Sequence, residues 1–226
     1  ILESSRISMG KLEIRSGAVD EKSFLERVLP MLQNSADRKG IMLTSSIKGV
    51  KNRNILIDES HVMQILVNLV SNAIKFTPEG GKVEFSVVAH ELPDRRVAHE
   101  YIIADTGCGM SASFQKRMYQ PFEQDNLTQS RDSGGTGLGL YIAKKFIDAM
   151  GGTISCQSIV NGGTTFTIRI EYSLAEETVP ENQISSFQQR QALSGKRVLI
   201  CEDQKVNAEI AKQMLERIGM HCEMVA

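Results

Sequence analysis

The fold of this chain is decided by the stretch Gly134-Gly135-Thr136-Gly137-Leu138-Gly139-Leu140, which runs into a helical segment from Tyr141 to Phe146. Glycines let backbone N–H groups approach a ligand closely, and the first turn of a helix carries unpaired N–H donors with a partial positive charge. This combination is typical of a phosphate-binding site. The same glycine spacing also occurs in plain tight turns, so the neighbouring segments must decide between the two.

The segment before this stretch, residues 124–133, is polar and shows no strand pattern. A dinucleotide-binding fingerprint needs a strand immediately before its glycines. A Walker-type phosphate loop needs a closing Gly-Lys-Ser/Thr, which is missing here. Both folds are therefore excluded, and the polar run is predicted to be a mobile lid over phosphates.

Composition sets the class of protein. The 226 residues can hold one domain and part of another, and a hydrophobic content of 41% is ordinary for a soluble globular protein. No stretch approaches the length of a membrane span. With 26 basic and 27 acidic residues, the chain offers no electrostatic case for nucleic acid or a membrane surface as partner.

The four cysteines, Cys108, Cys156, Cys201 and Cys222, lack the spacing of a metal site. They indicate a reducing, cytosolic setting, and no signal peptide is visible. The chain opens inside a helical pattern and ends inside a strand pattern. We therefore expect it to be part of a longer protein.

Hydrophobic periodicity, caps and turn residues predict an alternation of helices and strands. A β-α-β start is expected after a polar linker, with Glu202-Asp203 at the end of its first strand. The expected strands are Lys11–Arg15, Ile41–Ile47, Asn54–Ile57, Lys82–His90, His99–Ala104 after a polar loop Glu91–Ala98, Thr153–Ser158, Thr164–Tyr172, Arg197–Cys201 and Met220–Val225. One expected helix follows the N-cap Asp20 and is closed by Gly40, and a second follows the N-cap Asp58 and ends at Phe76. Further helices are expected over Ser111–Gln120, from the glycine-rich stretch to Met150, and over Lys205–Ile218.

The helix from Glu59 to Phe76 carries two series at helical spacing. One is apolar and predicts a buried stripe: Val62, Leu66, Leu69, Val70 and Ala73. The other lies on a different face: Asn68, Asn72, Lys75 and Phe76. It could be an ordinary polar side, but Asn is a poor helix former, and its neutral carbonyl oxygen suits Mg²⁺. These residues are therefore candidates for a site.

A second candidate follows a predicted strand: Asp105-Thr106-Gly107-Cys108-Gly109-Met110. Two glycines after an acid let the backbone fold under a flat ligand, and the carboxylate can then accept a hydrogen bond from an amino group. Asp followed by Gly is also a common turn, so the motif leaves both interpretations open when taken alone.

In order along the chain, these motifs resemble those of the catalytic, ATP-binding domain of sensor histidine kinases. The N box is Asn68 to Pro78, the first G box is Asp105 to Met110, the F box is Pro121-Phe122, and the second G box is Gly135 to Leu140. Gly163-Thr164-Thr165-Phe166 matches the closing strand. Each motif is modest, but the four in this order are specific, and the resemblance covers residues 20–172.

The resemblance implies an α+β fold: a two-layer sandwich with a mixed, mostly antiparallel five-stranded sheet and three helices on one face. It also implies a hybrid kinase. Residues 1–19 would end a dimerisation helix and form its exit strand, 20–172 would be the catalytic domain, 173–195 a linker, and 196–226 the incomplete start of a receiver domain. The accepting histidine would lie on a helix outside this sequence.

The resemblance also implies roles for individual residues. Asp105 would accept a hydrogen bond from the adenine amino group, Asn72 would ligate Mg²⁺ with Asn68 beside it, and Lys75 would meet phosphate oxygens. Asn68 and Lys75 are the catalytic candidates. The remaining nucleotide-binding candidates are Phe76, Gly107, Gly109, Met110, Phe122, Gly135, Thr136, Gly137, Leu138, Gly139, Leu140 and Thr165. Glu202 and Asp203 would form an incomplete receiver Mg²⁺ site.

The implied reaction is in-line transfer of the ATP γ-phosphate to a histidine, helped by positioning and charge neutralisation. Gyrase- and Hsp90-type ATPases of the same fold have a water-activating Glu where this chain has Asn68, and Asn cannot act as a base. A hydrolase of that type and a degenerate, nucleotide-binding scaffold are the alternatives. We expect none of His61, His90, His99 and His221 to accept the phosphoryl group.

The expected partners are ATP or ADP, the dimerisation helix and receiver domain of the same protein, and a downstream response regulator or phosphotransfer protein. The full-length protein is expected to be a homodimer, with no nucleic-acid partner. This segment is expected in the cytoplasm, with an anchor in the inner or plasma membrane left open for the full-length protein.

Overall fold

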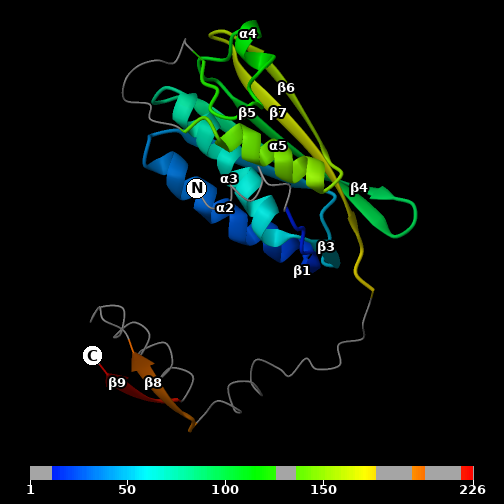
Figure 1. The fold of residues 1–226 in the computed structure, drawn as a ribbon, viewed down its shortest axis with the longest axis vertical. Helices are drawn as coiled ribbons and strands as arrows, with labels where there is room; N and C mark the ends of the chain where they lie inside the picture. Colours follow the sequence, from blue (N-terminus) through cyan, green and yellow to red (C-terminus); the bar gives the residue numbers. More distant parts are fainter. Residues whose placement is uncertain (1–11, 126–135, 177–194, 202–219, 226) are drawn as a thin grey trace. The chain divides into compact units, whose positions relative to one another are not determined.

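The computed structural model describes residues 12–125, 136–176, 195–201 and 220–225. The chain divides into two compact units, residues 1–176 and 177–226 (Figure 1). Within the described residues, no helix is long and apolar enough to cross a membrane.

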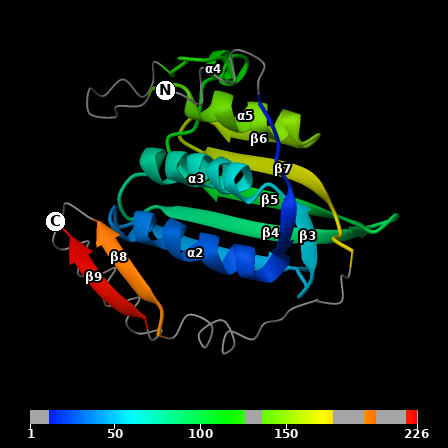
Figure 2. The ribbon, with the colours of Figure 1, turned by 60° about the horizontal axis from the view of Figure 1, so that its bottom comes forward.

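The first unit has two layers. Its five-stranded sheet has the order β2-β4-β5-β7-β6, in which β2 and β4 are parallel and the other neighbours antiparallel. The strands are β2 (Met42–Lys48), β4 (Lys82–Leu92), β5 (Arg96–Asp105), β6 (Thr153–Ile159) and β7 (Gly163–Ser173). Three helices, α2 (Glu21–Asp37), α3 (Glu59–Phe76) and α5 (Gly139–Ala149), cover one face (Figure 2). The predicted two-layer sandwich is confirmed.

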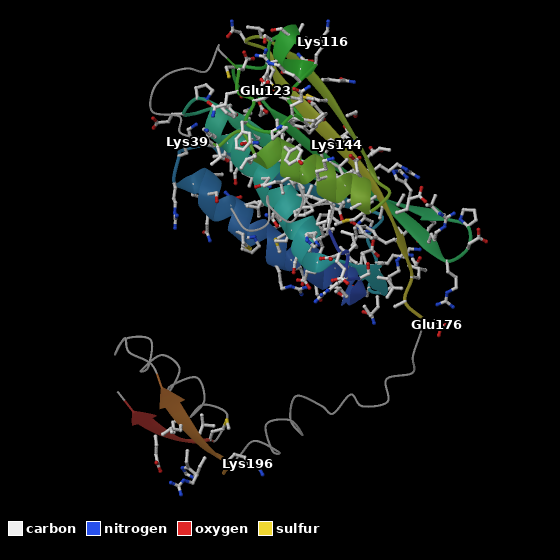
Figure 3. All side chains as sticks on the ribbon, in the orientation of Figure 1. Lys39, Lys116, Glu123, Lys144, Glu176 and Lys196 are labelled. Atoms are coloured by element: carbon white, nitrogen blue, oxygen red, sulfur yellow. The ribbon has the colours of Figure 1, made fainter. Side chains whose placement is uncertain are left out.

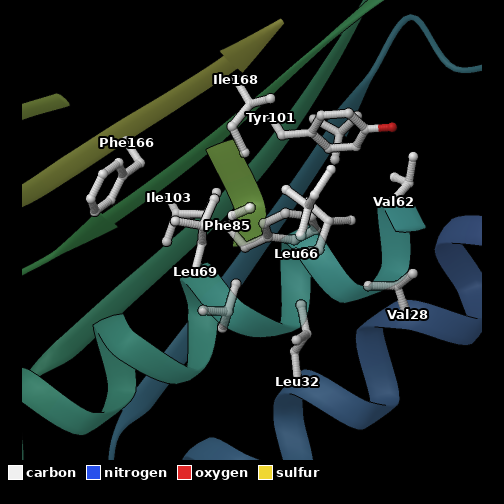
Figure 4. Close-up of a cluster of buried hydrophobic side chains, with 14 of the residues drawn as sticks. Val28, Leu32, Val62, Leu66, Leu69, Phe85, Tyr101, Ile103, Phe166 and Ile168 are labelled. Carbon is white, nitrogen blue, oxygen red and sulfur yellow. The ribbon is translucent and has the colours of Figure 1, made fainter. Parts of the chain in front are cut away.

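Helix α3 forms where capping and periodicity predict it. The Asp58 side chain accepts a hydrogen bond from the His61 N–H and caps the first turn. The whole predicted apolar stripe is buried. It packs between the sheet and α2 (Figure 4), and the labelled side chains are Val28, Leu32, Val62, Leu66, Leu69, Phe85, Tyr101, Ile103, Phe166 and Ile168. The buried stripe thus packs α3 against both the sheet and the neighbouring helix α2.

Helix α2 also begins at its predicted cap, because Asp20 accepts from the Ser23 N–H at 2.8 Å. It buries one apolar face and continues through the exposed Pro30 to Asp37. The chain then turns at Gly40, whose φ of +65° is the left-handed conformation that glycine favours.

Three sequence-based expectations differ from the structure. Residues 12–16 form no strand; instead Gly17–Asp20 forms β1, which pairs with β3 (Asn54–Ile57). The Arg15 N–H donates to the Asp58 carboxylate at 2.7 Å, which holds this segment beside the start of α3. The expected strand Lys11–Arg15 was therefore placed too early.

The expected loop Glu91–Ala98 is also wrong, since β4 runs to Leu92 and β5 starts at Arg96. Val97 and Ala98 are buried in the ladder, and the turn is closed by Asp94 and Arg95 at positive φ. The helix expected over Ser111–Gln120 is shorter: α4 spans Ala112–Gln115, capped by Ser111.

In the second unit, β8 (Arg197–Cys201) and β9 (His221–Val225) pair in parallel. Parallel neighbours need a crossover connection, as a β-α-β start requires. The expected helix Lys205–Ile218 and the pair Glu202-Asp203 lie outside the described residues.

Candidate functional site

A pocket of about 340 Å³ opens in the first unit between the end of α3, the loop after β5 and the start of α5. Ten of the residues predicted from the sequence line it: Asn72, Lys75, Phe76, Asp105, Gly109, Met110, Thr136, Gly137, Gly139 and Leu140. Segments that are far apart in the sequence therefore meet at one site. The side chains around it are drawn in Figure 3.

Asp105 lies at the end of β5, half-buried in the pocket wall. Its Oδ1 accepts hydrogen bonds from the backbone N–H groups of Gly107, at 2.8 Å, and Thr164, at 3.2 Å. Burial raises the pKa of Asp105, although these two N–H groups oppose the shift. Within the described residues, no hydrogen bond reaches Oδ2. This oxygen can accept one from a ligand.

The two glycines after Asp105 are required by close packing. A Cβ on Gly107 would lie 2.6 Å from the Phe76 carbonyl oxygen. A Cβ on Gly109, which has a φ of +66°, would lie 1.9 Å from the Ile159 carbonyl oxygen. The Cys108 N–H between them donates to the Phe76 oxygen at 3.2 Å. The loop is thus fixed directly against the end of α3.

The opposite wall is formed by the start of α5. Gly137 has a φ of +68°, and a Cβ there would meet the Phe122 backbone carbon at 2.7 Å. The Phe122 N–H donates to the Gly137 oxygen at 3.0 Å. Leu138 is the N-cap of α5 and makes no side-chain capping bond. The first turn of α5 therefore keeps N–H donors for an anion.

The polar series of α3 faces this helix start. Asn72 lines the pocket, and its Nδ2 would lie 3.8 Å from a Cβ on Gly139. Asn68 does not line the pocket but places Nδ2 3.5 Å from the Gly139 oxygen. The Lys75 ammonium lies 4.9 Å from the centroid of the Phe76 ring. The Asn68 and Asn72 amides thus lie next to Gly139, and Lys75 lines the same pocket.

Other predicted site residues lie elsewhere. Gly107 and Leu138 belong to the loops around the pocket without lining it. Phe122 is 73% exposed and contributes only its backbone. Thr164 lines the pocket, whereas Thr165 lies on the other face of β7, because side chains alternate along a strand. Gly135, Glu202 and Asp203, and the predicted lid from residue 126 on, lie outside the described residues.

Eight lining residues were missed: Ala73, Phe114, Met118, Glu123, Gln124, Asp125, Thr164 and Phe166. Phe114 and Met118 are four residues apart on one face of the α4 segment, which is a signal the sequence contains. Asp125 accepts from the Ser111 N–H at 2.9 Å, and Glu123 pairs with Arg117 at 2.8 Å. These two acids join residues 123–125 to the segment around α4.

Comparison with known families agrees with this geometry. The family model described as histidine kinase-, DNA gyrase B- and HSP90-like ATPase matches residues 57–174, which contain the whole described pocket. The chain belongs to this family. The four motifs that carry the sequence prediction all lie within the residues that match this family.

Curated relatives narrow the relationship to histidine kinases. The chain is 36% identical over 215 residues to the signal transduction histidine-protein kinase BarA of Escherichia coli, covering 95% of this chain and 23% of BarA. It is 32% identical over 226 residues to the virulence sensor protein BvgS of Bordetella bronchiseptica, covering 97% of this chain and 18% of BvgS. The chain spans a quarter or less of the length of these relatives.

Solved structures share the fold. The full-length ShkA crystal structure, in complex with AMPPNP, matches with a TM-score of 0.61 and 25% identity, over 100% of this chain and 44% of ShkA. The mycobacterial sensor histidine kinase MprB matches with a TM-score of 0.54 and 21% identity, over 71% and 99% of the two chains. The predicted histidine kinase catalytic domain is thus confirmed at the level of family and fold.

Proposed function

We propose that the first unit binds Mg-ATP in this pocket and donates the γ-phosphate to a histidine supplied by another segment of the full-length protein. The observation that carries the proposal is the pairing of two features in one pocket. An acceptor oxygen of Asp105 stands at one side, and the uncapped start of α5 stands at the other. An adenine amino group suits the first feature and phosphates suit the second.

The Asp105 end would select the base. Its carboxylate can accept a hydrogen bond from the exocyclic amino group of adenine, whereas guanine has a carbonyl at that place. An acceptor facing an acceptor is repelled and leaves both unpaired. The apolar residues Met110, Phe114 and Phe166 line the same pocket and would contact the flat ring. We therefore expect ATP to bind and GTP to be rejected.

The α5 end would hold the phosphates. The first turn of α5, which begins at Gly139, offers N–H donors, and Lys75 adds a positive charge. Within the described residues, no group of three or more His, Cys, Asp or Glu side chains could hold a metal ion. The neutral amide of Asn72 instead fits an ion whose other ligands are phosphate oxygens. Mg²⁺ bound there would neutralise phosphate charge.

Asn68 favours transfer over hydrolysis, since an amide cannot deprotonate water. Two of the four described histidines are also poorly placed to accept the phosphoryl group. His99 is fully buried, and His61 packs 4.3 Å from the Phe146 ring, measured between centroids. The acceptor histidine would therefore belong to a dimerisation helix, and the chain's own groups would position the γ-phosphate for it.

The flanking assignments are part of the same proposal. Residues 1–19 would form the end of a dimerisation helix and its exit strand, and residues 173–195 would link the two units. Residues 196–226 would form the start of a receiver domain, and the parallel pairing of β8 and β9 supports this last assignment. Glu202 and Asp203 would then belong to a receiver Mg²⁺ site. For the full-length protein we also propose a homodimer and a downstream regulator, as expected of the histidine kinases that the chain resembles.

Calorimetric titration tests this function. With Mg²⁺ present, we expect ADP to bind and GDP to fail, and Asp105→Asn to weaken ADP binding by about 100-fold, because the amide N–H₂ loses the acceptor. Asp37→Asn is the matched control, since Asp37 is exposed on α2, does not line the pocket and accepts a hydrogen bond from Gln33 Nε2. Absence of ADP binding by the native chain would contradict the proposal, and rapid steady-state hydrolysis of ATP would favour a hydrolase.

A further inference from the structure

The end of α3 has four backbone carbonyls that no N–H of the helix can satisfy, and each of them has a partner. The Ala73 oxygen accepts from the Thr77 N–H and hydroxyl, at 3.1 and 2.7 Å. The Phe76 oxygen accepts from the Cys108 N–H. The Ile74 and Lys75 oxygens both accept from one side chain, the ammonium of Lys39.

Lys39 reaches this position from the turn after α2. Its Nζ lies 2.8 Å from the Ile74 oxygen and 2.8 Å from the Thr77 oxygen, in addition to its bond with the Lys75 oxygen. An ammonium has three donors, and all three are used here. The turn itself is docked, because the Gly80 N–H donates to the Gly40 oxygen at 3.1 Å. Figure 3 labels Lys39 beside this end of the helix.

The charge also suits the position. The C-terminal end of a helix carries a partial negative charge, so a cation there is favourable. Burial against the helix end lowers the pKa of Lys39, with the Lys75 charge contributing in the same direction. The ammonium is therefore partly desolvated, and its three hydrogen bonds to carbonyl oxygens replace the lost contacts with water.

Two of the carbonyls that Lys39 holds, those of Ile74 and Lys75, belong to the last turn of α3, and the side chains of Lys75 and Phe76 in this turn line the pocket. The same turn presents the Phe76 oxygen to the loop that carries Asp105 and Gly107. We propose that Lys39 is a positioning residue of the nucleotide site, fixing the end of α3 so that Lys75, Phe76 and the Asp105 loop keep their places. This inference rests on the proposed function for its effect on affinity.

The test uses the whole 226-residue chain and Mg-ADP as the calorimetric probe. Lys39→Met should raise the dissociation constant by roughly tenfold, and Lys39→Arg should recover part of the loss. The control is Lys22→Met, which removes the same charge from an exposed i,i+4 pair with Glu26 and should change affinity by less than about twofold. A purely stabilising role would leave the affinity of folded Lys39→Met unchanged.

Amide hydrogen exchange without nucleotide provides an independent readout. The N–H groups of Thr77 and Cys108 bond to the last turn of α3, so they should exchange faster in Lys39→Met, while Ser23 at the start of α2 should not change. Native affinity or native exchange at Thr77 and Cys108 would overturn the inference. If the native chain binds no Mg-ADP, the proposed function fails, and the exchange arm still decides whether Lys39 holds the helix end.

If Lys39→Met does not fold, Lys39→Gln replaces it under the same criteria. Glutamine keeps two donors but loses the charge and part of the reach. A native dissociation constant for Lys39→Gln, together with native exchange at Thr77, would overturn the inference, and a weaker affinity of the folded variant would support it.

Discussion

Two carboxylates near opposite ends of β5 show how neighbours decide what a buried acid does. Asp105 ends the strand at the pocket. Glu21, the first residue of α2, is fully buried near the other end, where its Oε1 lies 2.7 Å from Nε2 of His99. His99 and Asp105 are six residues apart on β5, about 20 Å along a strand.

The two environments shift the pKa in opposite directions. At Asp105, burial dominates over two backbone N–H groups and raises the pKa. At Glu21, burial would also raise the pKa, but His99 and Arg53 outweigh it and lower the pKa. Arg53 Nε lies 2.8 Å from Glu21 Oε2. One carboxylate is satisfied within the protein, and the other keeps an oxygen for a ligand.

The Glu21 end is closed by a continuous polar network. His99 Nδ1 lies 3.0 Å from the Tyr101 hydroxyl, which lies 3.2 Å from the Tyr172 hydroxyl. Arg53 continues the network to Glu91 at 2.8 Å. The network joins the start of α2 to β4, β5, β7 and the residue before β3, so its role is to hold these elements together. This difference predicts that the two ends respond differently to mutation.

The largest expected effect comes from Glu21→Ala. Removing it leaves His99 buried without its carboxylate partner and Arg53 with one fewer, so the free energy of unfolding should fall by about 3–5 kcal/mol. Glu26→Ala, an exposed change on the same helix, should cost less than about 1 kcal/mol. Urea unfolding measures both. Equal losses in the two variants would show that the network contributes little.

The next effect is a dependence on pH, which should act on stability through Glu21 and on ADP affinity through Asp105. Because the folded pKa of Glu21 lies below its usual value of 4.5, Glu21 contributes stability above that value, and the contribution is lost as the pH falls through the folded pKa. The pKa of Asp105 is raised above the usual 3.8, so Asp105 should be protonated at a higher pH than an ordinary Asp. As the pH is lowered, ADP affinity should therefore fall before the stability contribution of Glu21 is lost.

Unfolding and calorimetric titration from neutral pH down to about pH 2 test this pair of effects, because the Glu21 contribution is lost below the usual pKa of a glutamate. Glu21→Gln should show a shallower loss of stability in acid than the native chain. The terminal phosphate of ADP also takes up a proton at about pH 6, so the native chain and Asp105→Asn are compared at each pH. The native affinity should show an additional fall in acid that is missing from Asp105→Asn. An identical pH dependence of ADP affinity in the two chains would contradict the assignment of Asp105.

The smallest expected effect is that of Tyr172→Phe. It removes one hydroxyl from the buried end of the network, where the remaining Tyr101 hydroxyl still contacts His99. The free energy of unfolding should fall by about 1 kcal/mol, and ADP affinity should not change. A change in ADP affinity would show that the Glu21 network and the Asp105 pocket are coupled, and would contradict their independence.

The sequence predicted local features well. The bounds of α3 and of β3 match the structure, because an N-cap, an apolar period and a turn define them locally. Burial of Val97 and Ala98 was missed, since it follows from pairing with β7 rather than from their own pattern. The choice of Thr165 over Thr164 depended on which face of β7 carries the pocket.

The polar network could not be predicted, because it joins residues that are far apart in the sequence. Glu21 and His99 show ordinary patterns in their own segments, a helix start and a strand. Only the pairing of β5 with β7 and the docking of α2 bring them together. In the site, Asp105 and the glycines were predictable because their chemistry is local, whereas Phe114 and Phe166 depend on packing.

The bridge between Ile55 and Leu174 has a consequence for folding. It is antiparallel, and the Ala175 N–H continues it by donating to the Asn54 oxygen at 3.0 Å. Ile55 and Leu174, which are far apart in the sequence, are thereby joined. Contacts between distant segments form slowly, because the intervening chain must first be ordered. We therefore expect β3 to gain its last backbone partners late, and the first unit to reach its full stability only after β7 is complete.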